Sequence, residues 1–213
     1  EAVGGETMLS RMAAQLEQAA DRGMRPTAAD RIAPWFTGAT LSIARNCVHR
    51  WAKRDPARVG AVFTGEDGSR RELTFAELSC DVTRLAEGLV RLGVEPGDRV
   101  AIYLPMSPEV AVASHACAHI GAVQVPLFSG FAAPAVVQRL RDSEAKVVIT
   151  ADYSLRRGAR LPMRETVEEA VREAPSVEHV VTWERAVPPL LVAITVTMFL
   201  PLAAGNLRLK RPL

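Results

Sequence analysis

Three arginines flank a glycine in the segment SLRRGAR, and they are well suited to hold a phosphate. Arg156, Arg157 and Arg160 surround Gly158. A guanidinium group is a planar fork that can donate two parallel hydrogen bonds to a phosphate. A basic motif this short also matches often by chance, so a solvated basic loop or a localisation-like patch is the competing interpretation.

A second arrangement with possible chemistry consists of His115 and His119, four residues apart in a stretch with helical spacing. This spacing can chelate zinc, but the intervening Ala-Cys-Ala lacks the glutamate of a metalloprotease helix, and no third ligand is apparent. Cys117 between them is expected to be a small core residue. We therefore expect no metal site.

The elements that must position these groups are clearest between Tyr103 and Asp152. Apolar runs alternate there with two helical patterns. The first of these begins at Pro108 and ends at Gly121. The predicted order is strand, helix, strand, helix, strand, over residues 99–104, 110–120, 122–127, 134–141 and 146–150. Strands that are apolar on both faces belong in a parallel sheet covered by helices. The sequence therefore predicts an α/β fold, with alternating strands and helices forming part of a doubly wound, mostly parallel sheet.

The flanking segments carry weaker but readable signals. Thr74 followed by Glu77 predicts a capping box that opens a helix ending near Leu92. After Asp152 we expect a basic loop before the next helix. The remaining predictions are helices at 8–22, within 35–51 and at 166–172, a hairpin pairing 61–64 with 72–74, and a strand at 178–182.

Composition limits the function classes. The chain has 213 residues and a net charge of +2, which gives no overall attraction to nucleic acid. Three cysteines without a CxxC pair favour a reducing compartment, and we expect the cytoplasm. The three tryptophans are too scattered to form a stacking platform and are interpreted as packing residues.

The end of the chain differs in character from the rest. Residues 187–205 carry no charge, and as a helix they would reach about 28 Å, just enough to cross a bilayer. Pro188, Pro189 and Pro201 shorten the uninterrupted helix to Leu190–Leu200. A foreign or out-of-frame end is therefore preferred over a membrane span. We divide the chain into an N-terminal helical extension and connector (1–34), a central domain (35–185) and an apolar tail (186–213).

Several blocks in order resemble the acetyl-CoA synthetase branch of the adenylate-forming acyl-CoA synthetases. They include WFTGATLSIARNCVHR, LGVEPGDRVAIYLPM, HACAHIGAVQVPLFSGF, DSEAKVVITAD, the RRG segment and PSVEHVV before Trp183. The resemblance runs from Trp35 to Arg185, about seven-tenths of the chain. It implies a partial AMP-binding domain of a ligase that forms an acyl-adenylate from a carboxylic acid and ATP. Coenzyme A then displaces AMP to give a thioester, and Mg²⁺ offsets the phosphate charge in the first step.

The resemblance also implies a coenzyme A site. Arg156 matches the first arginine of the family's Arg-x-Gly-Arg loop, Arg157 and Gly158 fit an Arg-Arg-Gly variant, and Arg160 lies one place after the second arginine. Phe128–Phe131 resembles the family's Phe-Gly-Gly-Phe turn, in which Gly130 allows close backbone approach. A turn that needs Gly130 only for its dihedral angles is the alternative.

The family's phosphate loop, ribose-binding aspartate and adenylation lysine do not occur in this sequence. This implies an N-terminal fragment, inactive alone, whose partner segments are the missing C-terminal part of the same enzyme. Two alternatives stay open: a non-catalytic coenzyme A-binding module and a membrane-anchored truncated protein. Nucleic acid is not expected as a partner.

Overall fold

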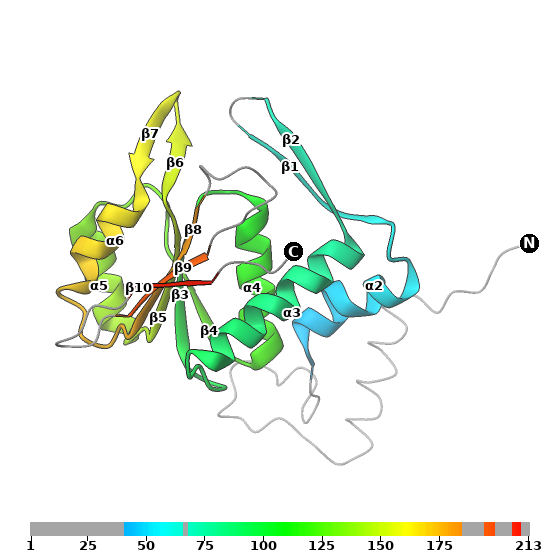
Figure 1. Ribbon diagram of the computed structural model, residues 1–213, viewed down its shortest axis with the longest axis horizontal. Coiled ribbons are helices and arrows are strands. Elements are labelled where there is room, and N and C mark those ends of the chain that lie inside the picture. Colours follow the sequence, from blue (N-terminus) through cyan, green and yellow to red (C-terminus); the bar gives the residue numbers. More distant parts are fainter. Residues whose placement is uncertain (1–40, 66–67, 185–193, 199–205, 210–213) are drawn as a thin grey trace, which may run out of the picture. The chain divides into compact units, whose positions relative to one another are not determined.

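The computed structural model describes residues 41–65, 68–184, 194–198 and 206–209 (Figure 1). The predicted helix at residues 8–22, the connector that follows it and the prolines of the apolar tail lie outside these ranges. The boundaries drawn at residues 34 and 185 stay predictions.

A six-stranded sheet forms the centre of the described structure, in the order β10-β9-β8-β5-β3-β4. Four of the six strands pair in parallel, as the apolar runs predicted. They are β3 (Arg99–Tyr103), β4 (Val123–Pro126), β5 (Val147–Ala151) and β8 (His179–Trp183). Residues Val147–Ala151 are buried along their whole length, as a central strand covered on both faces requires. The prediction of an α/β fold with a mostly parallel sheet is confirmed.

Two short strands continue this sheet beyond β8. β9 (Ile194–Met198) pairs antiparallel with β8, and β10 (Asn206–Leu209) pairs antiparallel with β9. The helix considered for Leu190–Leu200 is therefore wrong for residues 194–198, because backbone pairing with the edge of β8 holds them extended. Among the described residues, no helix combines the length and apolar character needed to cross a membrane.

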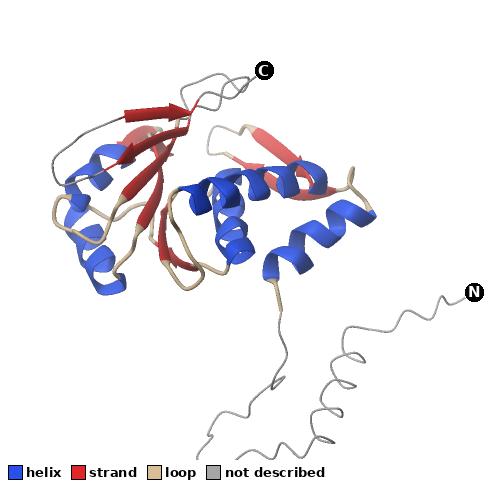
Figure 2. Cartoon of the chain, turned by 60° about the horizontal axis from the view of Figure 1, so that its bottom comes forward, coloured by secondary structure: helices blue, strands red, loops and turns tan. Residues whose placement is uncertain are grey.

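Helices cover both faces of the sheet (Figures 1 and 2). On one face lie α5 (Ala133–Ser143) and α6 (Met163–Val171), and on the other lies α4 (Pro108–Ile120), with α3 (Phe75–Arg91) packed against it. The core between these layers consists of fully buried aliphatic side chains, among them Leu89, Val100, Val136, Leu140, Ile149 and Val167.

The start of α3 and the end of α4 have the capping residues that the sequence predicted. Thr74 caps α3: its hydroxyl accepts from the Glu77 N–H, and the Glu77 carboxylate accepts from the Thr74 N–H, the predicted capping box. Gly121 ends α4 with a φ of 75°, a left-handed conformation that favours glycine.

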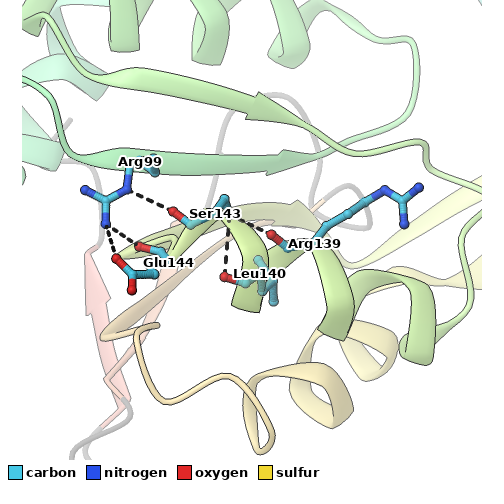
Figure 3. Close-up of polar contacts among 5 residues, drawn as sticks. All are labelled: Arg99, Arg139, Leu140, Ser143 and Glu144. Carbon is cyan, nitrogen blue, oxygen red and sulfur yellow. Dashed lines mark hydrogen bonds and ion pairs between the residues drawn. The ribbon is translucent and has the colours of Figure 1, made fainter.

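The end of α5 is stabilised differently, because Glu144 takes the left-handed conformation there with a φ of 48°. Figure 3 shows the Arg99 side chain reaching across from β3 to this end. Its guanidinium donates to the carbonyl of Ser143 (2.9 Å) and to the carbonyl of Glu144 (3.0 Å). These bonds satisfy two carbonyls that the helix leaves without partners.

Two hairpins and a short helix complete the described chain. The hairpin predicted before α3 is formed by β1 (Val59–Thr64) and β2 (Arg70–Thr74), and it follows η1 (Arg45–His49), a π-helical segment, and α2 (Arg50–Arg54). The expected basic loop after Asp152 is instead a hairpin of β6 (Tyr153–Arg156) and β7 (Ala159–Pro162), with α6 starting at Met163 rather than Thr166.

The reason for this second hairpin is its two-residue turn. Arg157 and Gly158 both have positive φ, 52° and 76°, as a type I′ turn requires. From the sequence we expected a loop in which Gly158 allows the chain to turn, and the structure shows that this turn joins two paired strands.

Candidate functional site

The candidate site lies at the carboxyl ends of the parallel strands, where ligands bind in open α/β sheets. A cavity of about 290 Å³ opens there. Its walls come from the loop after β3, the turn after β4, strand β6 and the tip of the β1–β2 hairpin. The lining residues are Thr64, Gly65, Ser69, Pro105, Met106, Phe128, Ser129, Ser154, Leu155 and Arg156.

The turn Phe128–Phe131 is held in place by Tyr103, the last residue of β3. The Tyr103 hydroxyl donates to the carbonyl of Phe131 (2.8 Å), and the carbonyl of Ser129 lies 3.3 Å from the same oxygen. Burial raises the pKa of Tyr103, which favours the protonated phenol that donates this hydrogen bond. The turn is thereby fixed relative to the sheet.

The aromatic rings of this turn are arranged at right angles. Phe128 and Phe131 meet edge to face with centroids 5.5 Å apart, a favourable aromatic geometry. The Arg139 guanidinium lies over Phe131, 4.1 Å from its centroid. Phe128 stays 57% exposed and offers an apolar surface at the mouth of the cavity.

Arg156 and Gly130, separate in the sequence, lie against each other. The guanidinium carbon of Arg156 lies 5.5 Å from the Phe128 centroid. A Cβ added to Gly130 would come within 2.5 Å of Nη1 of Arg156 and 2.6 Å of Cε1 of Phe128. Gly130 does not have a positive φ, so the alternative based on dihedral angles is not supported, and a side chain at this position would displace the end of the Arg156 side chain.

The other two arginines of the segment do not line this cavity. Arg160 pairs with Leu155 across the hairpin, whereas Arg156 pairs with Ala159, so Arg156 and Arg160 project from opposite faces. The Arg160 guanidinium lies instead 4.5 Å from the ring centroid of Tyr153. Arg157 occupies the turn with Gly158.

Sequence reasoning missed the wall made by the β1–β2 hairpin. Thr64, Gly65 and Ser69 reach the cavity from a hairpin that was recognised by its turn but not connected to any site. Ser154 was also missed, although it is a polar residue that is only 5% exposed in this wall. No local signal marks these residues, because their position depends on how the hairpins pack.

The two histidines of α4 do not face a common ligand. Nδ1 of His119 lies 2.8 Å from Nε2 of His49, and the Nδ1–H of His115 donates to the carbonyl of Ala111 (2.8 Å). His49 also contacts the hydroxyl of Ser79 at 2.8 Å. Burial, and after it the nearby His119, lowers the pKa of His49. In the part of the chain that the structure describes, no three potential metal ligands gather.

Comparison with known proteins places this arrangement in context. A model of the AMP-binding enzyme family matches residues 48–196. This match continues past Arg185, where we expected the resemblance to end, into β9. An acetyl-coenzyme A synthetase of Streptomyces coelicolor is 47% identical over 154 residues, which are 72% of this chain and 24% of that protein.

Relatives from two further organisms give the same result. An acetyl-coenzyme A synthetase of Methanothrix thermoacetophila is 46% identical over 155 residues, and one of Escherichia coli strain K12 is 42% identical over 154 residues. These matches cover 72% and 71% of this chain, and 24% of each relative. The chain thus spans about a quarter of the length of the curated relatives it matches.

Among solved structures, acetoacetyl-CoA synthetase from Streptomyces lividans superposes with a TM-score of 0.70 at 31% sequence identity. The superposition covers 86% of this chain and 30% of that chain.

Proposed function

This chain belongs to the family of AMP-binding enzymes, and we propose that it is part of a ligase that converts a carboxylic acid to its coenzyme A thioester. In the first step a carboxylate oxygen bonds to the α-phosphorus of ATP, and pyrophosphate leaves with the electron pair of the broken α–β bond. In the second step the coenzyme A thiol loses its proton, its sulfur bonds to the acyl carbon, and AMP leaves.

Both steps belong to the whole ligase. Mg²⁺ would offset the charge of ATP in the first step. Among the described residues no set of carboxylates fits this ion, so no step through it is assigned to this chain. What we assign to the described residues is a contact with coenzyme A, the second substrate of the ligase.

We propose that Arg156 binds a phosphate of coenzyme A at the mouth of the cavity. A guanidinium fork suits a phosphate, and Arg156 is exposed beside a glycine whose missing side chain leaves room for it. Arg157 and Gly158 form the turn that orients β6. Arg160 faces the other side of the hairpin, so it adds positive charge near coenzyme A without contacting the phosphate.

The observation that carries this proposal is the contact between Gly130 and Arg156. The two residues come from separate segments, each singled out for coenzyme A by its own motif, and the fold brings them together at the carboxyl edge of the sheet. A solvated basic loop would not need a matching glycine on a neighbouring turn.

The first test measures coenzyme A binding to the full chain by calorimetry. We expect Arg156→Gln to weaken binding about tenfold, because a charge-assisted hydrogen bond contributes about 1.5 kcal/mol or more. Arg160→Gln is the matched control, since it removes the same charge from the opposite face of the same hairpin, and it should change the Kd less than about twofold. No saturable binding at millimolar coenzyme A, or equal effects of both substitutions, would contradict the assignment.

A second test addresses the ligase itself. The 154 aligned residues of this chain replace their counterparts in the Streptomyces coelicolor acetyl-coenzyme A synthetase. We expect a folded chimera that forms AMP only when ATP, a carboxylic acid and coenzyme A are all present. In that chimera Arg156→Gln should raise the KM for coenzyme A and leave the KM for ATP unchanged. A chimera that binds coenzyme A but forms no acyl-adenylate would favour the non-catalytic binding module.

We also propose a cytoplasmic location for this protein. Cys47, Cys80 and Cys117 are all free thiols, as a reducing compartment would keep them. Oxidised, cross-linked protein recovered from cells would speak against it.

A further inference from the structure

Three arginine side chains surround the indole ring of Trp51 in α2 and the turn that follows it. The guanidinium carbons of Arg50, Arg54 and Arg58 lie 5.1, 5.5 and 5.4 Å from the ring centroid. We name these four residues the Trp51 arginine cluster. All three carbons lie within 5.5 Å of the ring centroid, so three positive charges surround one ring.

The backbone holds the arginines in these positions. Arg50 and Arg54 are four residues apart on α2 and therefore project from one side of the helix. The carbonyl of Arg58 accepts a hydrogen bond from the N–H of Phe75 (2.9 Å), which ties the turn to the start of α3. Phe75 in turn stacks on Trp51, with centroids 6.0 Å apart and planes inclined by 26°. The cluster is thus assembled by the packing of α2 on α3.

No carboxylate in the described part of the chain forms an ion pair with these three arginines, and all three residues are exposed. Besides these three, the stretch from Arg45 to Arg58 contains one further arginine, one lysine and one acidic residue, Asp55. Like charges gathered around one ring repel one another, and a bound anion would remove that repulsion.

We propose that the Trp51 arginine cluster is a binding site for a small phosphate-bearing anion, of the size of pyrophosphate. Guanidinium groups match phosphate oxygens in pairs, and three of them around one ring suit a small, multiply charged ligand with oxygens for more than one of them. The cluster lies on α2 and its following turn, whereas the candidate coenzyme A contact lies on β6 and the turn after β4. The two sites are therefore separate and can be tested separately.

The geometry favours a free anion over larger polyanions. A nucleic-acid strand bound in sequence-tolerant fashion stacks its bases on open aromatic faces, but the Trp51 ring already contacts Phe75 and three guanidinium groups. An anionic membrane attracts cations that are spread over a surface, whereas these three converge on one ring.

The test follows the indole N–H resonance of Trp51 by NMR in the full chain, identified by its loss in Trp51→Phe, during titration with pyrophosphate. Chloride is adjusted to keep the ionic strength constant. We expect a saturable shift of this resonance. Arg54→Gln and Arg50→Gln should each weaken binding about tenfold, since each removes charge-assisted hydrogen bonds.

Arg91→Gln is the matched control, because it removes an exposed arginine from the far end of α3, and it should change the affinity less than about twofold. A shift that chloride alone reproduces, or equal weakening by Arg54→Gln and Arg91→Gln, would overturn the proposal. A parallel sedimentation with vesicles of phosphatidylserine and phosphatidylcholine distinguishes the source of the phosphate. Vesicle binding that requires Arg50 and Arg54, without saturable pyrophosphate binding, would also overturn it in favour of a membrane contact.

Discussion

Gly130 gives the sharpest test of the proposed coenzyme A contact, because the methyl group of alanine would displace the ends of the Arg156 and Phe128 side chains. The added Cβ would lie 2.5 Å from Nη1 of Arg156, 2.6 Å from Cε1 of Phe128 and 3.1 Å from its Cζ. To restore ordinary van der Waals contact, both groups must retreat by about 1 Å.

This displacement should weaken coenzyme A binding and leave the free energy of unfolding nearly unchanged. Gly130 has no positive φ, so alanine brings no backbone strain, and the displaced atoms are the ends of two exposed side chains. We expect the free energy of unfolding to change by no more than about 0.5 kcal/mol. A displacement of about 1 Å breaks the geometry of a charge-assisted hydrogen bond, and at an exposed position we take the lower end of its contribution, about 1.5 kcal/mol. The Kd for coenzyme A should therefore rise about tenfold.

Gly158→Ala provides the matched comparison in the neighbouring turn. A Cβ at Gly158 meets nothing within 4 Å, but the residue has a φ of +76°. Alanine is strained there by about 1–2 kcal/mol, so this substitution should lower stability without any clash against Arg156.

Both variants are measured by urea denaturation and by calorimetric titration with coenzyme A. The reasoning is refuted if Gly130→Ala leaves the affinity unchanged, or if it lowers the free energy of unfolding as much as Gly158→Ala does.

Three further predictions concern stability, each measured by chemical denaturation. Gly88→Ala in α3 should raise the free energy of unfolding by about 0.5–1 kcal/mol, because the added methyl meets no atom within 4 Å and glycine disfavours a helix interior; a loss would show an unrecognised contact. Tyr103→Phe should lower it by about 1 kcal/mol and weaken coenzyme A binding, since the hydrogen bond to Phe131 is lost; unchanged stability and affinity would mean that Tyr103 does not hold the turn. The lowered pKa of His49 means that the unfolded chain binds this proton at higher pH than the folded chain, so stability should fall as pH drops below the unfolded value of about 6.5. His49→Gln should reduce this fall, and a wild-type chain that gains stability from pH 7.5 to 5.5 would contradict it.

The proposed coenzyme A site shows what a sequence motif predicts and what it leaves open. The sequence picked out Arg156, Arg157, Gly158, Arg160 and Gly130 by resemblance, and their roles stay predictions. The structure adds that Arg156 and Gly130 touch while Arg160 faces the other side of the hairpin. Strand pairing decides this, since neighbouring residues in a strand alternate between its faces, and the segment had been interpreted as a loop.

Local sequence patterns were sufficient to predict the features that depend on residues a few positions apart. The capping box of Thr74 and Glu77, the left-handed glycine at Gly121 and the apolar runs of the parallel strands each rest on local hydrogen bonding, backbone freedom or burial. These features were therefore correct before any tertiary contact was known.

The contacts between distant segments, in contrast, depend on how the elements pack in the folded chain. Residues 194–198 looked like part of a helix by hydropathy, yet they form a strand because the edge of β8 offers unpaired backbone groups. His49 and His119 meet across two helices, and the three arginines gather around Trp51 because Phe75 packs there. Such contacts bring together groups whose separation along the chain carries no periodic signal, so only the folded packing of the elements fixes them.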